Sequence, residues 1–205
     1  MVVVKRTRLS PEERRAQLID LGARMLADRP LEQISVEEIA DQAGVSRGLL
    51  FHYFASKRDF HLAIVRHVSA EMLERTEPDP SREPLEILHT AIESYVDYVS
   101  ENRDSYVSLL RGTASGDPEM REEFERTRAT MASRIVTRLP SIGIEPDHRI
   151  ELAVRGWIAF VEEATISWLR DPHITREELI DLIVTALPAV AMSAASAAAL
   201  LGTAK

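Results

Sequence analysis

The chain of 205 residues contains no cysteine. This absence excludes a disulfide framework, thiol catalysis and any zinc site built on thiolates. Signatures of common enzymes are missing too: the sequence has no P-loop, no Rossmann glycine pattern, no Gly-x-Ser-x-Gly and no His-Glu-x-x-His. The six histidines include no i,i+4 pair suited to a metal. We therefore expect a protein that is not an enzyme and that needs neither cofactor nor metal.

Long hydrophobic runs are also scarce. The N-terminus has only Met1 and three valines before Lys5, too few apolar residues for a secretory signal. One uncharged run of 23 residues, Leu182 to Ala204, is long enough to span a membrane. Its second half is mostly Ala and Ser, and Pro188 interrupts it, so we expect a buried interface helix followed by a flexible tail. These features predict a cytoplasmic protein without a membrane segment.

Charge is distributed unevenly along the chain. The formal net charge of -8 by itself argues against a nucleic-acid partner. Residues 1–78, however, hold 12 basic and 12 acidic side chains, whereas residues 79–205 hold 13 and 21. Residues 44–58 carry cations and no acid, and the N-terminal arm adds Lys5, Arg6 and Arg8. Such a split would attract DNA to short cationic segments and orient the acidic body away from it.

Apolar residues recur with the helical period of about 3.6, and few segments alternate with period two. This pattern predicts an all-α protein of about nine helices. Ser10 with Glu13, Ser35 with Glu38, and Thr175 with Glu178 form capping-box patterns at helix starts. The helices are expected at about 10–28, 36–43, 46–54, 56–76, 84–101, 103–115, 117–139, 147–170 and from 175 onward.

Residues 35–54 show the pattern of a helix-turn-helix, in which a glycine-bearing turn separates two short helices. Gly44 lies where the chain needs a left-handed conformation. An ordinary corner between two helices would have the same pattern, but the neighbouring cations favour DNA binding. The residues placed to form the small core are Ile39, Ala40, Val45 and Leu50.

The second helix of such a motif lies in the major groove, with its N-terminal residues against base edges. Arg47 is then the best candidate for reading a base, because a guanidinium can meet guanine O6 and N7 together. Gly48 lets the backbone approach the bases. Ser35, Tyr53 and Lys57 are placed for phosphate. Simple helix capping is an equal and compatible interpretation of Ser35 and of Ser46.

Residues 10–75 resemble the N-terminal domain of TetR-family transcriptional regulators. The resemblance implies a three-helix DNA-binding domain and a variable helical C-terminal domain. It also implies a homodimer, in most members a repressor, that binds a palindromic operator and dissociates when a small molecule is bound. The residues that carry it are Ile39-Ala40, Ala43-Gly44-Val45-Ser46 and Leu50-Phe51-His52-Tyr53-Phe54-Ala55-Ser56-Lys57.

By position, this resemblance implies DNA contacts by Ser35, Arg47, Gly48, Tyr53 and Lys57. Phe51 departs from the family, in which a tyrosine is common at this position. A phenyl ring cannot donate a hydrogen bond to phosphate, so it would contact a thymine methyl or the sugar instead. The predicted DNA-contacting set is Ser35, Ser46, Arg47, Gly48, Phe51, His52, Tyr53 and Lys57.

The segment at about 147–170 and the last helix carry apolar residues on more than one face. The resemblance implies that the last two helices pair with their symmetry mates, so we expect a homodimer through about 150–190. Packing within one chain is the alternative. Between the linker and this interface we predict a ligand pocket, although each of its residues taken alone is more often plain core than a ligand contact: Tyr95, Tyr98, Tyr106, Leu110, Phe124, Arg128, Met131, Trp157 and Phe160.

Glu162 and Glu163 interrupt the apolar helix, and carboxylates at such a place must be paired, hydrated or functional. A handle for a ligand, a salt bridge with Arg155 and a contact across the dimer are all open. The predicted pocket is largely apolar, which favours a lipid-like or otherwise hydrophobic effector.

Together these features predict a ligand-responsive transcriptional regulator that acts as a repressor. Its partners would be duplex operator DNA, a small-molecule effector and a second copy of the chain, and a helical adaptor that binds only protein is the alternative. The expected parts are a DNA-binding domain with a basic arm at 1–55, a connecting helix at 56–78, a ligand-binding and dimerisation domain at 84–192 and a flexible tail at 193–205.

Overall fold

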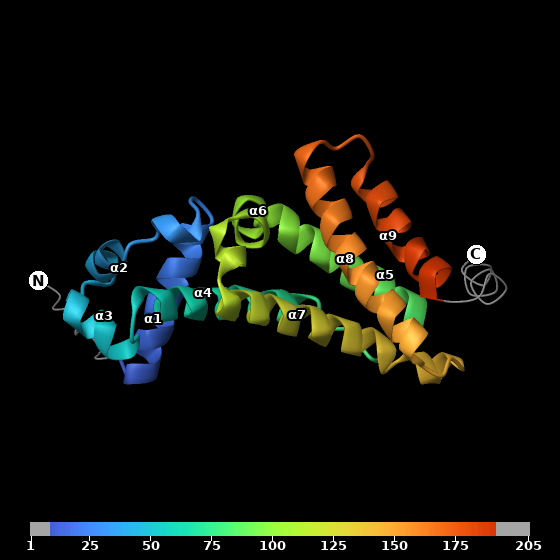
Figure 1. The fold of residues 1–205 in the computed structure, drawn as a ribbon, viewed down its shortest axis with the longest axis horizontal. Helices are drawn as coiled ribbons and strands as arrows, with labels where there is room; N and C mark the ends of the chain where they lie inside the picture. The colour runs from blue at the N-terminus through green and yellow to red at the C-terminus, as the bar shows by residue number, and fades with distance from the viewer. Residues whose placement is uncertain (1–8, 192–205) are drawn as a thin grey trace, which may run out of the picture. The chain divides into compact units, whose positions relative to one another are not determined.

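A computed structural model describes residues 9–191 of the chain, so the basic arm and the tail predicted at 193–205 lie outside it. Residues 9–191 form nine α-helices and three short 3-10 helices, without a β-strand (Figure 1). The all-α prediction is therefore confirmed. The described residues fall into two compact units: the first comprises 9–68 with 104–120, and the second comprises 69–103 with 121–191.

The first unit contains the short helices that the sequence places in its helix-turn-helix. Two long helices belong to both units, because α4 (Lys57–Arg75) continues past Val68 and α7 (Pro118–Val136) begins before Arg121. The remaining elements of the first unit are α1 (Pro11–Leu26), η1 (Leu31–Gln33), α2 (Val36–Ala43), α3 (Arg47–Tyr53), α6 (Arg103–Arg111) and η2 (Thr113–Gly116).

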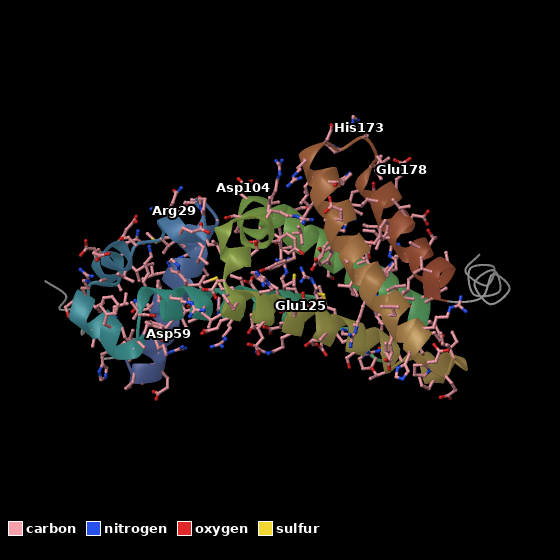
Figure 2. The ribbon with its side chains drawn as sticks, in the orientation of Figure 1. Arg29, Asp59, Asp104, Glu125, His173 and Glu178 are labelled. Atoms are coloured by element: carbon pink, nitrogen blue, oxygen red, sulfur yellow. The ribbon has the colours of Figure 1, made fainter. Side chains whose placement is uncertain are left out.

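Serine caps begin the three N-terminal helices where the sequence predicts them. The Ser10 hydroxyl accepts from the Glu13 N–H, and the Glu13 carboxylate accepts from the Ser10 N–H, which completes a capping box. At α2 only half of the predicted box forms: Ser35 accepts from the Glu38 N–H, but the Glu38 carboxylate binds Arg29 instead. This bidentate pair ties the loop after α1, where Figure 2 labels Arg29, to α2.

Gly44 ends α2 and sets the angle at which α3 follows. Its φ of 64° and ψ of 38° are left-handed, a conformation that a side chain disfavours, as the sequence predicted. The next N–H, of Val45, donates back to the Ala40 carbonyl at 2.9 Å and closes the helix end. The predicted core is present in Ile39, Ala40 and Leu50, whereas Val45 is only half-buried.

A close approach of α1 to α4 anchors the motif. A Cβ on Gly22 would lie 2.3 Å from the Cδ1 atom of Ile64 and 3.1 Å from the Phe60 ring, so only glycine fits there. Phe60 also meets Phe54 edge-on at 4.9 Å between ring centroids, and both rings are buried. The core therefore holds the C-terminal end of α3 against the helix that follows it.

The second unit is built on the pairing of its last two helices, which lie side by side in Figure 1. The buried indole N–H of Trp157 donates to the Ile183 carbonyl at 2.9 Å and joins these two helices. Besides the shared parts of α4 and α7, the unit consists of α5 (Pro84–Glu101), η3 (Leu139–Ile142), α8 (His148–Arg170) and α9 (Arg176–Ala191).

The expectation that Pro188 interrupts the last uncharged run is wrong, because Pro188 lies inside the continuous helix α9. Proline costs a helix one hydrogen bond, but here Leu187, Pro188 and Ala191 are all buried, and this packing offsets the loss. Among the described residues, no helix is both long and apolar enough to cross a membrane.

Candidate nucleic-acid interface

One face of α3 is open to solvent while the opposite face is anchored. Leu50 is fully buried under the helix, whereas the Arg47 side chain is 63% exposed and Gly48, Phe51 and His52 are also exposed. A Cβ on Gly48 would meet only the Ser46 hydroxyl, at 3.9 Å. The backbone of α3 therefore presents an open surface that another molecule can approach closely.

The two predicted serines act as helix caps. Ser35 accepts from Glu38 N–H at 3.0 Å, and Ser46 accepts from Leu49 N–H at 3.2 Å. Capping uses the hydroxyl oxygen as an acceptor and leaves its O–H free to donate. The capping interpretation is thus compatible with a phosphate contact at the N-termini of α2 and α3.

Two side chains one turn apart on α4 hold the backbone that leads into α2. The Lys57 ammonium donates to the Glu32 carbonyl at 3.0 Å, and Nε2 of His61 lies 3.1 Å from the Ile34 carbonyl. Burial lowers the pKa of His61, so the ring is neutral near pH 7 and Nε2 donates its hydrogen to the carbonyl. These contacts position Ser35. The ammonium of Lys57 has further N–H donors that can bind an anion.

Carboxylates that the sequence did not single out pair with the cations at 44–58. Glu37 on α2 lies 3.0 Å from the Arg47 guanidinium, which also stacks 5.4 Å from the Phe51 ring centroid. Arg58 binds Asp117 bidentately. Glu37 and Asp117 carried no local signal, because only the packing of separate helices brings them beside their arginines.

The predicted ligand-pocket residues divide between the two units. Tyr106 and Leu110 belong to the first unit, and the other seven belong to the second. Leu110, Arg128 and Met131 are half-buried, and Phe160 is 38% exposed on the outer side of α8. The side chains that are buried as a pocket or a core would require are Tyr95, Tyr98, Tyr106, Phe124 and Trp157.

Glu162 is paired with Arg128 of α7, and not with Arg155. The guanidinium donates from Nε and Nη2 to the two carboxylate oxygens at 2.9 to 3.1 Å. A third contact reaches Glu125, which Figure 2 labels on α7. One turn further along α8, the hydroxyl of the fully buried Thr165 has no hydrogen-bond partner in the described part of the chain. Polar groups of this kind in an apolar body can recognise the polar part of a ligand.

The outer faces of α8 and α9 expose large apolar side chains. Leu152 is 72% exposed, Leu182 47% and Val190 51%. Gly156 lies on the α8 face between Leu152 and Phe160, and a Cβ there would meet nothing within 4 Å. The fold of one chain leaves this apolar surface uncovered.

Among residues 9–191 there is no group of three or more His, Asp or Glu side chains that could hold a metal ion. The site offers exposed cations, open backbone and helix N-termini. These are the means by which proteins bind a polyanion.

An exposed recognition helix on a helix-turn-helix, together with a separate helical body, defines a helix-turn-helix transcription regulator. Two family models match the chain: "Bacterial regulatory proteins, tetR family" at residues 18–64, and "Tetracyclin repressor-like, C-terminal domain" at residues 84–190. The chain belongs to the TetR family of transcriptional regulators. Because this is a family of regulators, the expectation of a protein that is not an enzyme is confirmed.

Similar proteins cover most of the chain. The transcriptional activator FasR of Mycolicibacterium smegmatis is 25% identical over 183 residues, which are 85% of this chain and 81% of FasR. The crystal structure of a TetR-family regulator from Streptomyces coelicolor is 30% identical, has a TM-score of 0.79 and covers 94% of this chain and 85% of its own. Bacillus subtilis FadR, crystallised with stearoyl-CoA, is 20% identical with a TM-score of 0.65 over 86% of this chain and 97% of its own, which shows a shared fold.

Proposed function

We propose that the chain is a ligand-responsive repressor that binds palindromic operator DNA as a homodimer in the cytoplasm and is released by a small hydrophobic effector. The observation that carries the proposal is the open face of α3, where the exposed Arg47 follows a serine cap and precedes an unobstructed glycine. A helix presented in this way fits the major groove of a duplex.

Within this proposal the exposed residues divide into base-reading and phosphate-binding groups. Arg47 meets guanine in the groove, and Gly48 allows the backbone of α3 to come close. Phe51 contacts a thymine methyl or a sugar. The residues proposed for the DNA backbone are Ser35, Ser46, His52, Tyr53 and Lys57, of which Ser35 and Tyr53 are half-buried.

The homodimer is proposed through the exposed faces of α8 and α9. Burying Leu152, Phe160, Leu182 and Val190 against their symmetry mates would remove apolar surface from water. Gly156 supports the same proposal, because its missing side chain is not needed for packing within the chain and would let a partner helix approach closely. A twofold dimer would place two copies of α3 on successive turns of one face of DNA, roughly 34–36 Å apart.

For the effector we propose a fatty-acyl compound. The second unit is rich in buried apolar side chains, and FadR, which shares the fold, was crystallised in complex with stearoyl-CoA. Arg128 and the unpaired Thr165 hydroxyl are the groups proposed for the polar part of the molecule. Phe160, by contrast, is proposed for the dimer face rather than for the pocket, because it is exposed.

The proposed route of release is α4. This helix runs without a break from Lys57 in the first unit to Arg75 in the second. In the second unit Arg134 of α7 donates to the Leu73 and Thr76 carbonyls at the end of α4, so a shift of α7 would pull on α4. An effector changes DNA affinity only by the difference in its own affinity for the two states.

The test begins with selection of duplexes by the full-length chain from a random pool. We expect an enriched palindrome whose binding weakens steeply with salt and is reversed by stearoyl-CoA. Enrichment without any effect of stearoyl-CoA would reject the acyl effector alone. Failure to enrich any sequence would reject the regulator and favour the protein-binding adaptor. A promoter–reporter pair then separates repressor from activator.

A further inference from the structure

Arg47, the proposed base reader, contacts two side chains of the helix-turn-helix itself. Its Nη1 atom lies 3.0 Å from Oε1 of Glu37, and its guanidinium stacks 5.4 Å from the Phe51 ring centroid. Glu37 lies in the first turn of α2, and Arg47 is the first residue of α3. The turn at Gly44 therefore brings a carboxylate to the face of the helix-turn-helix that would meet DNA.

The fold has little need of this ion pair. The side chains of Glu37 and Arg47 are 53% and 63% exposed, and ion pairs as open as this contribute only about 0–1 kcal/mol to stability. An acid in the first turn of α2 interacts favourably with the helix dipole, but Glu38 in the same turn already provides this interaction. A carboxylate at this place would also repel the phosphates of DNA and so lower the affinity for any duplex. Discrimination between sequences is a role that would explain its presence there.

The other two cations of residues 44–58, Lys57 and Arg58, have partners of a different kind. Lys57 binds a neutral carbonyl, that of Glu32, and can add a phosphate without separating charges. Arg58 pairs with Asp117 and Glu119, which lie outside the helix-turn-helix. Among the described cations of residues 44–58, Arg47 alone has a carboxylate partner on the motif itself.

We propose that Glu37 is a specificity-determining residue that reads a base pair together with Arg47. On unrelated DNA the carboxylate competes with phosphate for the guanidinium and is left without a partner when Arg47 turns away. On the correct site guanine O6 and N7 replace the carboxylate at Arg47, and Glu37 accepts a hydrogen bond from the N4 amino group of a cytosine in the adjoining base pair. The inference rests on the proposed DNA binding.

The test compares Glu37→Gln with Asp41→Asn. Asp41 lies one turn further along α2, is exposed and has no ion pair among the described side chains, so its change alters the net charge equally. The full-length variants are titrated onto the duplex enriched by the wild-type chain and onto a scrambled duplex, with fluorescence anisotropy as the readout. A melting curve checks that each variant folds.

We expect Glu37→Gln to bind the scrambled duplex more tightly and to lower the ratio of the two affinities about tenfold, whereas Asp41→Asn changes both affinities alike. Replacing the cytosine should weaken the wild type and leave the Glu37→Gln variant unchanged. In an Arg47→Ala background, Glu37→Gln should lower the ratio by less than it does in the wild-type background, because the part of its effect that passes through Arg47 is lost. An unchanged ratio for Glu37→Gln, or equal ratios for the Glu37→Gln and Asp41→Asn variants, overturns the inference. A wild-type chain that enriches no duplex overturns the proposed function as well.

Discussion

Arg58 and Asp117 are 59 positions apart in the sequence, yet their ion pair joins the first turn of α4 to the residue that precedes α7. Nε and Nη2 of the guanidinium donate to the two carboxylate oxygens at 2.6 and 2.9 Å. Asp117 also accepts from the N–H groups of Glu119 and Met120 and so caps α7. The hydrogen bond from Arg58, more than any other contact, holds the pKa of Asp117 down to about 2.

This depressed pKa predicts a loss of stability in acid. The carboxylate binds protons more weakly in the folded chain than in the unfolded chain, so its contribution is complete above the ordinary pKa of 3.8 and is lost as the pH falls toward 2. Asp117→Asn should lower the melting temperature at pH 7 and flatten its fall between pH 4 and about 2. Thermal denaturation followed by circular dichroism measures both, and parallel pH profiles for the two proteins would contradict the assignment.

The close contact at Gly22 predicts that even one methyl group is harmful there. Gly22→Ala places a Cβ against the buried Ile64 side chain, and the strain should outweigh the gain in helix propensity and destabilise the chain by about 1–3 kcal/mol. Gly48→Ala is the matched control, since it makes the same change in a helix where space is open. Urea denaturation should show no loss for this control, while its affinity for DNA falls. Equal stabilities of the two variants would refute the steric argument.

Arg47 and Lys57 should respond differently to removal. Arg47→Ala is expected to cost about 1–3 kcal/mol on the enriched duplex and to relax the preference at one base pair. Lys57→Ala should weaken binding to all sequences alike and lower the salt slope by about 1. Gel shifts over a series of salt concentrations and base variants measure both effects. If the two variants behave identically, the division between base reading and phosphate binding is wrong.

Gly156 tests the proposed dimer. Gly156→Leu adds a side chain where the isolated chain has open space, so the protomer should fold, but a close helix pair should separate. We expect the dissociation constant of the dimer, measured by sedimentation, to rise by about tenfold or more, since overpacking costs about 1–3 kcal/mol. Ser133→Leu, at an exposed position of α7, serves as the control. A dimer of unchanged strength would place the interface elsewhere.

Local rules were enough to predict the helices and the turn of this protein. Capping by Ser10, Ser46 and Asp147 depends on residues three positions away, so the helix starts could be predicted from the sequence. Gly44 and the buried Leu50 follow from the same short-range logic. Residue type, rather than spacing, predicted a buried Leu50 and an exposed Arg47, because residues three positions apart lie on neighbouring sides of a helix.

The charge partners, by contrast, were decided by the tertiary structure. Glu37 beside Arg47, Asp117 beside Arg58 and Arg128 beside Glu162 come from different helices, and no sequence spacing encodes their meeting. Of the alternatives left open for Glu162, the salt bridge with Arg155 is wrong for this reason. Phe160 lies on the exposed side of α8 because the rotation of this helix follows its packing on α9. Sequence periodicity determines that a helix has a buried face, but only packing determines which neighbour covers it.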